Sequence, residues 1–260
     1  MPSPDLIGRR FAQAQTTYGL HAHVQARVAD RLIALLNETI GHIHGSAIDI
    51  GCGTGLLTRR VHANHTITQW ALNDLYSPPE ALVRDLAPTP TTSLIGDAQT
   101  LDLGGPYALM CAGSSVHWFA SPQSFCTRVP DLLTNGGVFA MVTYGPGNLK
   151  EVAALTDHGL HYPALSEWVG WLTTAGMTIT AVEQGEEIEL FDTPLDALKS
   201  LKATGVTATG GTSIRTPSAL RRLDEQWREH YSTPDGQVTL SWRPVWLIAT
   251  NQNPQVGRMK

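Results

Sequence analysis

The segment Asp49-Ile-Gly-Cys-Gly-Thr-Gly55 has the residue types that a nucleotide-cofactor site requires. A short apolar run, Ser46–Ile50, precedes it, and a helical pattern of Leu56, Leu57 and Val61 follows it. Glycines let the backbone approach a ligand closely, and the N-terminus of a helix offers unpaired N–H groups. A strand, a glycine turn and a helix in this order predict a cofactor site, with an ordinary tight turn as the alternative.

The spacing of the glycines separates two classes of cofactor. A dinucleotide-binding fold has the pattern G-x-G-x-x-G, whose third glycine permits close packing of helix on strand. Here that third position is Leu56. The pattern acid-x-G-x-G-x-G instead resembles motif I of the class I methyltransferases, which implies S-adenosylmethionine (SAM) as the cofactor. The residues assigned to SAM within this turn are Asp49, Gly51, Cys52, Gly53 and Gly55.

Polar and small residues also end the next three strand-like runs, and in such sheets ligands bind beyond the C-terminal ends of the strands. Asp74 could accept hydrogen bonds from both ribose hydroxyls, and Leu75 could pack on the adenine ring. Asp97 could accept the adenine amino group while the Ala98 N–H reaches a ring nitrogen. The carbonyl of Gly113 could accept the ammonium of the methionine part. Taken singly, Asp74 or Asp97 could equally be a helix-capping or turn carboxylate.

Strand and helix patterns alternate along the chain, which predicts βαβ units and a parallel, doubly wound sheet. Two helical stripes come first, with members three or four residues apart: Phe11, Ala14 and Tyr18, then Val24, Val28, Leu32 and Leu35. The predicted strands are Ser46–Ile50, Thr66–Asn73, Thr92–Ile95, Tyr107–Gly113, Val138–Tyr144, Thr178–Leu190 and Gln237–Thr250.

Two later features refine this expectation. Pro163 opens a predicted helix with Leu165, Trp168 and Leu172 on its apolar face, and Gly176 stands where a C-terminal cap belongs. Pro244 falls inside the last strand, where its missing N–H predicts a bulge.

The fold class expected is therefore α/β and Rossmann-like, with a seven-stranded, mostly parallel sheet and helices on both faces. Residues 1–40 are assigned to an N-terminal helical lid, residues 41–192 and 235–252 to the SAM-binding core, and residues 193–234 to a helical insertion before the last strand that recognises the substrate.

Composition agrees with a globular enzyme. The chain has 260 residues, 42% hydrophobic and 16% charged, and a net charge of −5 that argues against general nucleic-acid binding. No apolar run approaches the ~20 residues of a membrane span, and the N-terminus does not have the pattern of a signal peptide. Three cysteines without a C-x-x-C pair favour a reduced, cytoplasmic setting. Histidines show no metal-ligand spacing, so no metal is assigned.

Three segments resemble the malonyl-acyl-carrier-protein O-methyltransferases of biotin synthesis. Arg10–Gln25 follows their opening pattern R-F-x-x-A-x-x-Y-x-x-x-A-x-x-Q. Ser115–Trp118 resembles their hydrophobic-Q-W signature, with His117 in place of the glutamine, and Phe191–Gly205 ends in their L-K-x-T-G pattern. The Gly/Thr-rich loop Thr207–Thr212 departs from the family, so it leaves substrate contacts more open than cofactor contacts.

The resemblance implies methyl transfer from SAM to the free carboxylate of a malonyl thioester on acyl-carrier protein. That carboxylate is ionised near neutral pH, since such acids titrate near ~4, so no general base is required. The resemblance also implies that Tyr18 and Gln25 belong to the cofactor site. Tyr18 can close the site and donate a hydrogen bond, and His117 and Trp118 follow the fourth strand, where they would face the methyl group. A core tyrosine and a packed Trp beside a surface His are the alternatives.

The insertion carries a local excess of positive charge. Between Thr193 and Tyr231 there are six Lys/Arg and four Asp/Glu, which gives +2 locally and leaves −7 for the rest of the chain. Acyl-carrier proteins are strongly acidic, so this island could steer docking, although a solvated helix face has the same composition. The docking residues proposed are Lys199, Arg215, Arg221 and Arg222. Lys202 is expected to face the malonyl carboxylate instead.

The function expected is SAM-dependent carboxyl O-methylation of malonyl-acyl-carrier protein by a monomer, giving the methyl ester that starts biotin (pimeloyl) synthesis. A methyltransferase for a free small carboxylic acid is the alternative enzyme, and a catalytically silent SAM-binding protein is the alternative from another class. The sequence leaves open the residue that holds the malonyl carboxylate.

Overall fold

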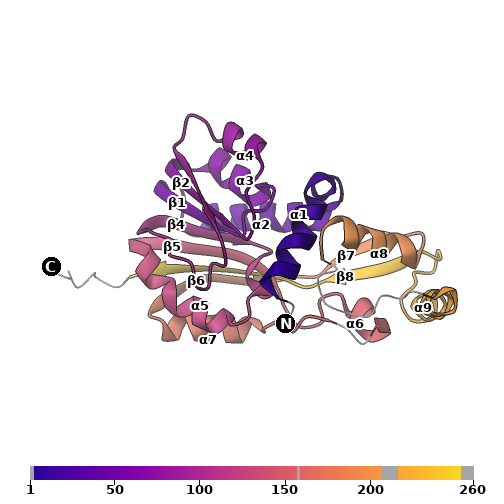
Figure 1. Cartoon of the computed structure of the whole chain (residues 1–260). Helices are drawn as coiled ribbons and strands as arrows, with labels where there is room; N and C mark the ends of the chain where they lie inside the picture. The colour runs from indigo at the N-terminus through magenta and orange to yellow at the C-terminus, as the bar shows by residue number, and fades with distance from the viewer. Residues whose placement is uncertain (1–2, 157–158, 207–215, 253–260) are drawn as a thin grey trace.

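A computed structural model gives the structure of the protein and describes residues 3–156, 159–206 and 216–252 (Figure 1). Its centre is a seven-stranded sheet in the order β3-β2-β1-β4-β5-β9-β6, in which only β9 runs antiparallel to its neighbours. Strand order changes direction between β1 and β4, where crossovers to opposite sides leave a crevice. The strands are β1 His44–Ile50, β2 Thr66–Asp74, β3 Thr91–Ile95, β4 Tyr107–Gly113, β5 Leu133–Tyr144, β6 Met177–Gln184 and β9 Pro244–Asn251. The expected α/β, Rossmann-like architecture with a seven-stranded, mostly parallel sheet is confirmed.

Helices cover both faces of this sheet (Figure 1). One face carries α2 and α3, and the other carries α5 and α7, while α1 lies across the C-terminal ends of the strands. The bounds are α1 Pro4–His21, α2 His23–Thr39, α3 Leu56–Asn64, α4 Glu80–Asp85, α5 Pro122–Arg128, α6 Lys150–Thr156 and α7 Leu165–Thr174, with short 3-10 turns η1 Val116–Trp118 and η2 Pro130–Leu132. No helix in the described part of the chain is long and apolar enough to span a bilayer.

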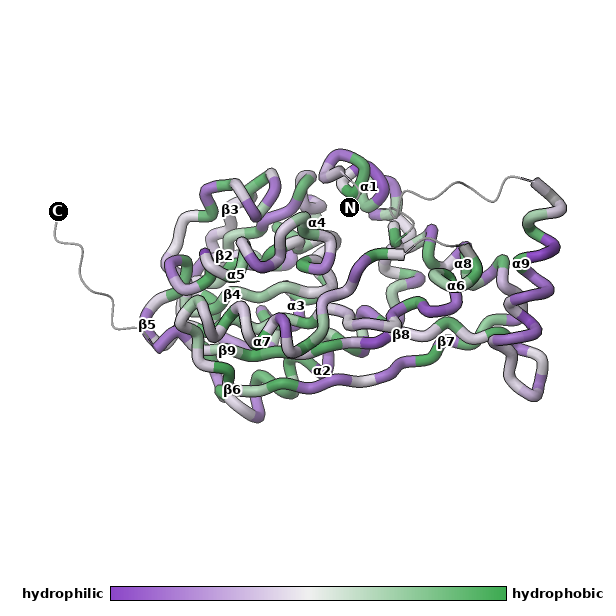
Figure 2. Tube along the Cα trace, turned by 90° about the horizontal axis from the view of Figure 1, so that it is seen from below, coloured by the Kyte–Doolittle hydropathy of each residue, from purple (hydrophilic) through white to green (hydrophobic). Residues whose placement is uncertain are grey.

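Alternation along the strands builds two separate cores. In β5, Val138, Ala140 and Val142 face the α2–α3 layer, whereas Phe139 and Met141 face the α5–α7 layer. A strand buried on both faces reads as a continuous apolar run, and this is why the central strands were recognisable from sequence. Figure 2 shows the same strands in hydrophobic colours.

The expected N-terminal lid over residues 1–40 is wrong for its second half. Helix α2 packs against α3, β5, β6 and β9, and its apolar stripe, which includes Val28 and Leu32, is fully buried. Only α1 remains over the strand ends. The periodicity of a helix shows that one face is apolar, but it does not say which surface that face covers.

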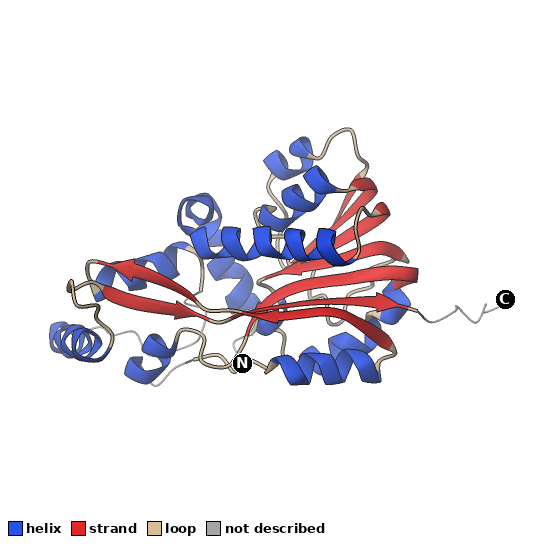
Figure 3. Cartoon of the chain, turned by 180° about the vertical axis from the view of Figure 1, so that it is seen from behind, coloured by secondary structure: helices blue, strands red, loops and turns tan. Residues whose placement is uncertain are grey.

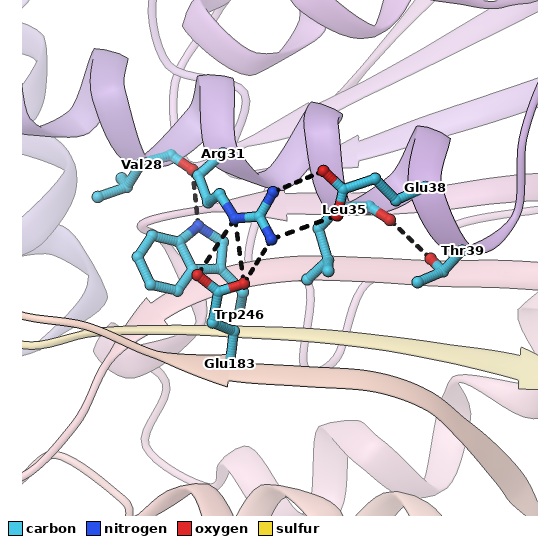
Figure 4. A network of polar contacts seen from close by, with 7 residues as sticks. All are labelled: Val28, Arg31, Leu35, Glu38, Thr39, Glu183 and Trp246. Carbon is cyan, nitrogen blue, oxygen red and sulfur yellow. Dashed lines mark hydrogen bonds and ion pairs between the residues drawn. The ribbon is translucent and has the colours of Figure 1, made fainter.

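Polar contacts also hold α2 on the sheet (Figure 4). The Arg31 guanidinium donates to both carboxylate oxygens of Glu183 on β6, at 2.7–3.1 Å. It also donates to the carboxylate of Glu38, which lies seven residues further along α2. Beneath them the Trp246 indole N–H of β9 donates to the carbonyl of Val28 at 2.8 Å. The α2 helix is therefore part of the core unit and is tied to the two strands that close the sheet.

The two closing strands are each divided, which the sequence analysis missed. After Gln184 the chain bends and forms β7 (Glu187–Phe191), which pairs antiparallel with β8 (Val238–Trp242) in a separate two-stranded sheet. Figure 3 shows that the two closing segments, β6–β7 and β8–β9, each run between the main sheet and this second sheet. The expected bulge at Pro244 is instead the start of β9, directly after the break at Arg243.

The insertion is therefore larger than the expected 193–234 and is not purely helical. Between β7 and β8 lie α8 (Pro194–Ala203) and α9 (Pro217–His230). Trp227 of α9 is fully buried and its indole N–H donates to the carbonyl of Thr239 on β8 at 3.0 Å. We call β7, α8, α9 and β8 the insertion module. Figure 2 shows its outer helix, α9, in mainly hydrophilic colours at the end of the molecule away from the C-terminus.

Candidate functional site

A large cleft opens beyond the C-terminal ends of β1, β2 and β4, with an empty volume of about 1110 Å³. We call it the main cleft. Its lining contains nearly every residue that the sequence analysis assigned to SAM: Tyr18, Gln25, Asp49, Gly51, Cys52, Gly53, Asp74, Leu75, Asp97, Ala98 and Gly113. Local patterns at separate strand ends thus come together at the switch in strand order.

The glycine turn between β1 and α3 has the backbone shape that glycine permits. Gly51, Gly53 and Gly55 have φ values of +71°, +52° and +84°. A Cβ at Gly51 would overlap Ser115, whose hydroxyl donates to the carbonyl of Ile50 at 2.6 Å. Gly55 does not line the main cleft. It is the N-cap of α3, and a Cβ there would overlap Leu82, so its role is in packing.

Two buried carboxylates, Asp49 and Asp74, stand at the floor of the main cleft. Asp74 accepts hydrogen bonds from the N–H groups of Gly53 (2.8 Å) and Leu75 (2.7 Å). Asp49 accepts from the Thr58 hydroxyl at 2.6 Å through one oxygen, whereas its other oxygen is buried without a partner among the described residues. Burial raises the pKa of Asp49 to about 7 and that of Asp74 to about 6. An unpaired buried acceptor beside a second acid is suited to a cationic ligand.

Asp97 reaches the main cleft in a fixed orientation. Its carboxylate accepts from the backbone N–H and the side-chain amide of Gln99, and the Gln99 carbonyl oxygen accepts from the Ser121 N–H. Gln99 and Tyr76 also line the main cleft and were missed by the sequence analysis. Their proximity in sequence to Asp97 and Asp74 was the signal that could have indicated them.

Helix α1 covers the main cleft. Ile7, Gly8 and Phe11 line it, and the Cα of Gly8 lies so close to Leu75 that a Cβ would stand 3.3 Å from the Leu75 Cβ. Gln15 contributes a buried amide nitrogen with no partner among the described residues. Tyr18 also lines it, and burial beside Asp74 raises the pKa of its hydroxyl, which therefore stays protonated.

A second, smaller hollow adjoins the main cleft and has an empty volume of about 300 Å³. We call it the aromatic recess. Its lining is Phe11, Tyr18, Gln25, Ser114, His117, Trp118, Tyr144, Asn148, Tyr162, Thr204, Val206 and Trp242. Five of these, Phe11, Tyr18, Gln25, Ser114 and Trp118, also line the main cleft, so the two spaces share a wall.

His117 is part of this recess and is not the surface residue of the alternative interpretation. Its ring is buried, lies within hydrogen-bond distance (3.2 Å) of the Thr143 hydroxyl, and contacts the rings of Tyr144 and Tyr162 at 5.3 and 5.7 Å. Burial lowers its pKa to about 3, so the imidazole is neutral at physiological pH. A neutral buried ring is a spacer and hydrogen-bonding group rather than a charged catalyst.

The three segments that carry the family resemblance meet around Phe11. Its ring makes an edge-to-face contact with Trp118 of η1, with centroids 5.5 Å apart. A Cβ at Gly205 would lie 2.9 Å from the Phe11 ring, so glycine is required where the insertion module touches α1. Thr17 of α1 adds a hydrogen bond to the Ala203 carbonyl at 2.9 Å. The signature residues are thus partners in one packing junction.

Several expected site residues lie elsewhere. Lys202 is exposed on α8 and lines neither the main cleft nor the aromatic recess, so the structure does not bring it to the expected substrate position. Arg215 and the Thr207–Thr212 loop lie outside the described residues. Among the residues that the structure describes, no group of three His, Cys, Asp or Glu side chains is arranged to hold a metal ion.

Comparison with known proteins identifies the family. The sequence is 38% identical to the malonyl-acyl-carrier-protein O-methyltransferase of Porphyromonas gingivalis over 94% of this chain and 95% of that protein. It is 33% identical to the protein of the same name from Haemophilus influenzae, over 94% and 93%. This chain belongs to the malonyl-acyl-carrier-protein O-methyltransferase family. No protein-family model matches the sequence.

Solved structures agree on the fold of this methyltransferase. A 1,6-didemethyltoxoflavin N1-methyltransferase of Burkholderia thailandensis, with bound S-adenosylhomocysteine, superposes with a TM-score of 0.56 at 12% identity and covers 97% of this chain and 92% of that one. A SAM-dependent methyltransferase of Mesorhizobium loti gives 0.51 at 17% identity, with 85% and 96% covered. Identities this low support the fold alone.

The main cleft of this methyltransferase fits SAM, its cofactor. Asp74 would bind the ribose, Asp97 and Ala98 the adenine, and the unpaired oxygen of Asp49 and the Gly113 carbonyl the ammonium end. Gly53 has only the Tyr76 hydroxyl near its missing Cβ, at 3.9 Å, so the backbone there is open to a ligand. These residue assignments remain predictions.

Proposed function

We propose that the protein transfers the methyl group of SAM to the free carboxylate of a malonyl group carried as a thioester on acyl-carrier protein. The observation that carries the proposal is membership of a family whose curated relatives have that name, at up to 38% identity along nearly the whole chain. The main cleft and the adjoining aromatic recess support it, because a methyl donor and a small acceptor need neighbouring sites. A start to biotin synthesis follows from the family resemblance alone.

The chemistry makes small demands on acid–base groups. When bound, SAM supplies a methyl group on a positively charged sulfur. The acceptor carboxylate is ionised already, because its pKa lies near ~4. His117 is neutral and buried, and no proton needs to leave the acceptor, so positioning and exclusion of water are the main contributions of the protein. Positioning of this kind supplies roughly 7–11 kcal/mol.

Each wall of the site has a part in that positioning. Helix α1 covers the main cleft through Ile7 and Phe11, and Tyr18 stands at the wall between the two spaces with its hydroxyl protonated. Trp118 lies on the same wall and is held by the Phe11 ring. We infer that these side chains orient the acceptor toward the methyl group and keep water out.

We further infer that the acidic carrier protein docks on the insertion module. Arg221 and Arg222 are exposed on α9, and neither forms an ion pair with any residue that the structure describes. Lys199 is exposed on α8 but is paired with Asp196 at 2.9 Å, so it contributes less free charge. Arg215 stays a docking prediction without a described position. We expect the enzyme to act as a monomer.

The decisive experiment is methyl transfer from labelled SAM to malonyl-, succinyl- and acetyl-carrier protein, with free malonate and malonyl-CoA alongside. The expected result is rapid, base-labile methyl ester on malonyl-carrier protein and none on the acetyl form, which has no free carboxylate. Equal or faster methylation of free malonate would instead indicate a small-acid methyltransferase. SAM binding without turnover on every acceptor would indicate a silent SAM-binding protein.

A further inference from the structure

Asn148 presents an unpaired donor to the aromatic recess. The residue lies between β5 and α6 and is 4% exposed. Its side-chain oxygen accepts from the Arg243 N–H at 3.0 Å, which fixes the orientation of the amide. Its nitrogen, Nδ2, is buried and has no hydrogen-bond partner in the described part of the chain. Buried donors are nearly always paired, so an unpaired one that lines a hollow indicates a missing acceptor.

Two tyrosine hydroxyls accompany this amide in the recess. The Tyr144 hydroxyl accepts from the Ser114 hydroxyl at 3.3 Å, which leaves its own proton free to donate. Burial raises the pKa of Tyr162 to about 12, partly offset by the nearby Asn148 side-chain amide, whose geometry falls short of a hydrogen bond, so this hydroxyl is protonated as well. Both rings contact His117. The recess therefore offers three neutral donors.

The same recess contains no charge. None of its described lining residues is Lys, Arg, Asp or Glu, and His117 is neutral. The backbone N–H of Arg243 binds Asn148, but its guanidinium is paired with Glu186 at 2.8 Å. Donors without a cation orient an anion while stabilising it less than a guanidinium would.

We propose that the aromatic recess holds the carboxylate of the acyl group during methylation, through Asn148 Nδ2 and the hydroxyls of Tyr144 and Tyr162. This assignment rests on the proposed function. One carboxylate oxygen forms the bond to the methyl carbon as the carbon–sulfur bond breaks, its electron pair stays on sulfur, the two charges cancel and no proton moves. A cation beside the carboxylate would stabilise the charged ground state more than this charge-dispersed transition state.

The test compares binding of malonyl- and acetyl-carrier protein, which differ by one carboxylate, in the presence of S-adenosylhomocysteine. Asn148→Asp keeps the acceptor for the Arg243 N–H but replaces the donor by an oxygen, and Tyr162→Phe removes one hydroxyl. In each variant the preference for the malonyl form is expected to fall by about 10- to 100-fold, the usual range for a hydrogen bond to a charged group. Affinity for the acetyl form and for S-adenosylhomocysteine should stay within about twofold.

Asn64→Asp on α3 is the matched charge control, since Asn64 lines neither space, and it should leave the preference unchanged. If both carrier proteins lose affinity equally in Asn148→Asp and Tyr162→Phe, those residues are structural and the assignment is overturned. If the wild type methylates malonyl-carrier protein and the variants keep its preference, the proposed function stands and the recess assignment fails. A wild type that neither methylates nor prefers the malonyl form overturns both.

Discussion

Asp74 illustrates how one side chain shapes the cofactor site and contacts its ligand. Its carboxylate accepts from the Gly53 and Leu75 N–H groups and so joins the glycine turn to the end of β2. Each oxygen has remaining lone pairs for a ribose hydroxyl. The residue is predictable from sequence because it directly ends a strand, whereas its contact with Gly53 requires the fold.

Asp74→Ala is expected to weaken SAM binding by about 2–4 kcal/mol, because two charge-assisted hydrogen bonds are lost and water replaces them in part. Isothermal titration calorimetry measures this directly. The exposed Asp85→Ala, which removes an ion pair with Arg59 outside the cleft, is a control that should leave affinity unchanged. An unchanged dissociation constant in Asp74→Ala would remove that residue from the site.

His117 is expected to be dispensable as a base. Burial lowers its pKa from the ordinary 6.5 to about 3, so the ring stays neutral throughout the range from about pH 6 to 9. The rate with malonyl substrate should be flat over that range where chemistry limits turnover. His117→Gln, which keeps a polar partner for Thr143, should retain most of the activity. A break in the profile near ~6.5 that disappears in His117→Gln would contradict this.

At the scale of elements, strands were easier to predict than their partners. The central strands β4 and β5 are buried on both faces over most of their length and carry largely apolar runs, so their positions agree with expectation. The division of the two closing strands at 185–186 and at Arg243 was missed, although the polar run Glu183–Glu187, with Gly185 inside it, and the Arg243-Pro244 pair were signals that could have indicated it. Helix α2 was assigned to a lid because the apolar periodicity of its sequence does not show which surface the helix packs against.

The revised place of α2 predicts a large effect on stability. Leu32 is 1% exposed against the sheet, so Leu32→Ala should lower the free energy of unfolding by about 2–5 kcal/mol through lost burial and a residual cavity. Arg31→Met should cost less, about 1 kcal/mol or below, because its ion pairs with Glu183 and Glu38 are partly exposed. Urea denaturation followed by circular dichroism tests both. If Leu32→Ala left the free energy of unfolding unchanged, the placement of α2 in the core would be contradicted and the lid assignment favoured.

For the whole molecule, local motifs placed the main cleft but not the aromatic recess. The glycine turn and the strand-end acids are short patterns at the switch in strand order, where the fold brings them together. Tyr144 ends β5 and Asn148 lies in the loop that follows it, whereas Tyr162 lies between α6 and α7, and nothing in their neighbouring residues marks the three as partners. Lys202 was assigned to the substrate from its place in the L-K-x-T-G motif. The structure explains that motif by the packing of Gly205 on Phe11, and the lysine itself is exposed.

Charge distribution over the molecule predicts the behaviour of the docking surface. Arg221→Glu combined with Arg222→Glu should slow association with carrier protein, and added salt should shrink the difference from wild type, because these exposed charges act at long range. Stopped-flow binding measures the rate. SAM affinity and turnover of malonyl-CoA should not change. Arg221→Glu alone and Arg84→Glu on α4 are a matched pair of single charge reversals at exposed positions, and equal slowing by Arg84→Glu would show that docking does not depend on α9.

The paired acids beneath the glycine turn have a consequence for product inhibition. SAM carries one positive charge more than the product S-adenosylhomocysteine, and Asp49 and Asp74 ionise only as pH rises through about 7 and about 6. Above these pKa values the two carboxylates are ionised and favour SAM over S-adenosylhomocysteine. Below them both acids are neutral, and the preference for SAM decreases. The ratio of the two dissociation constants, product over substrate, should therefore increase between pH 5.5 and 8, and competition titrations at the two pH values would measure it. In Asp49→Asn the increase should be smaller. A constant ratio in the wild type would show that these carboxyls do not sense the sulfonium charge.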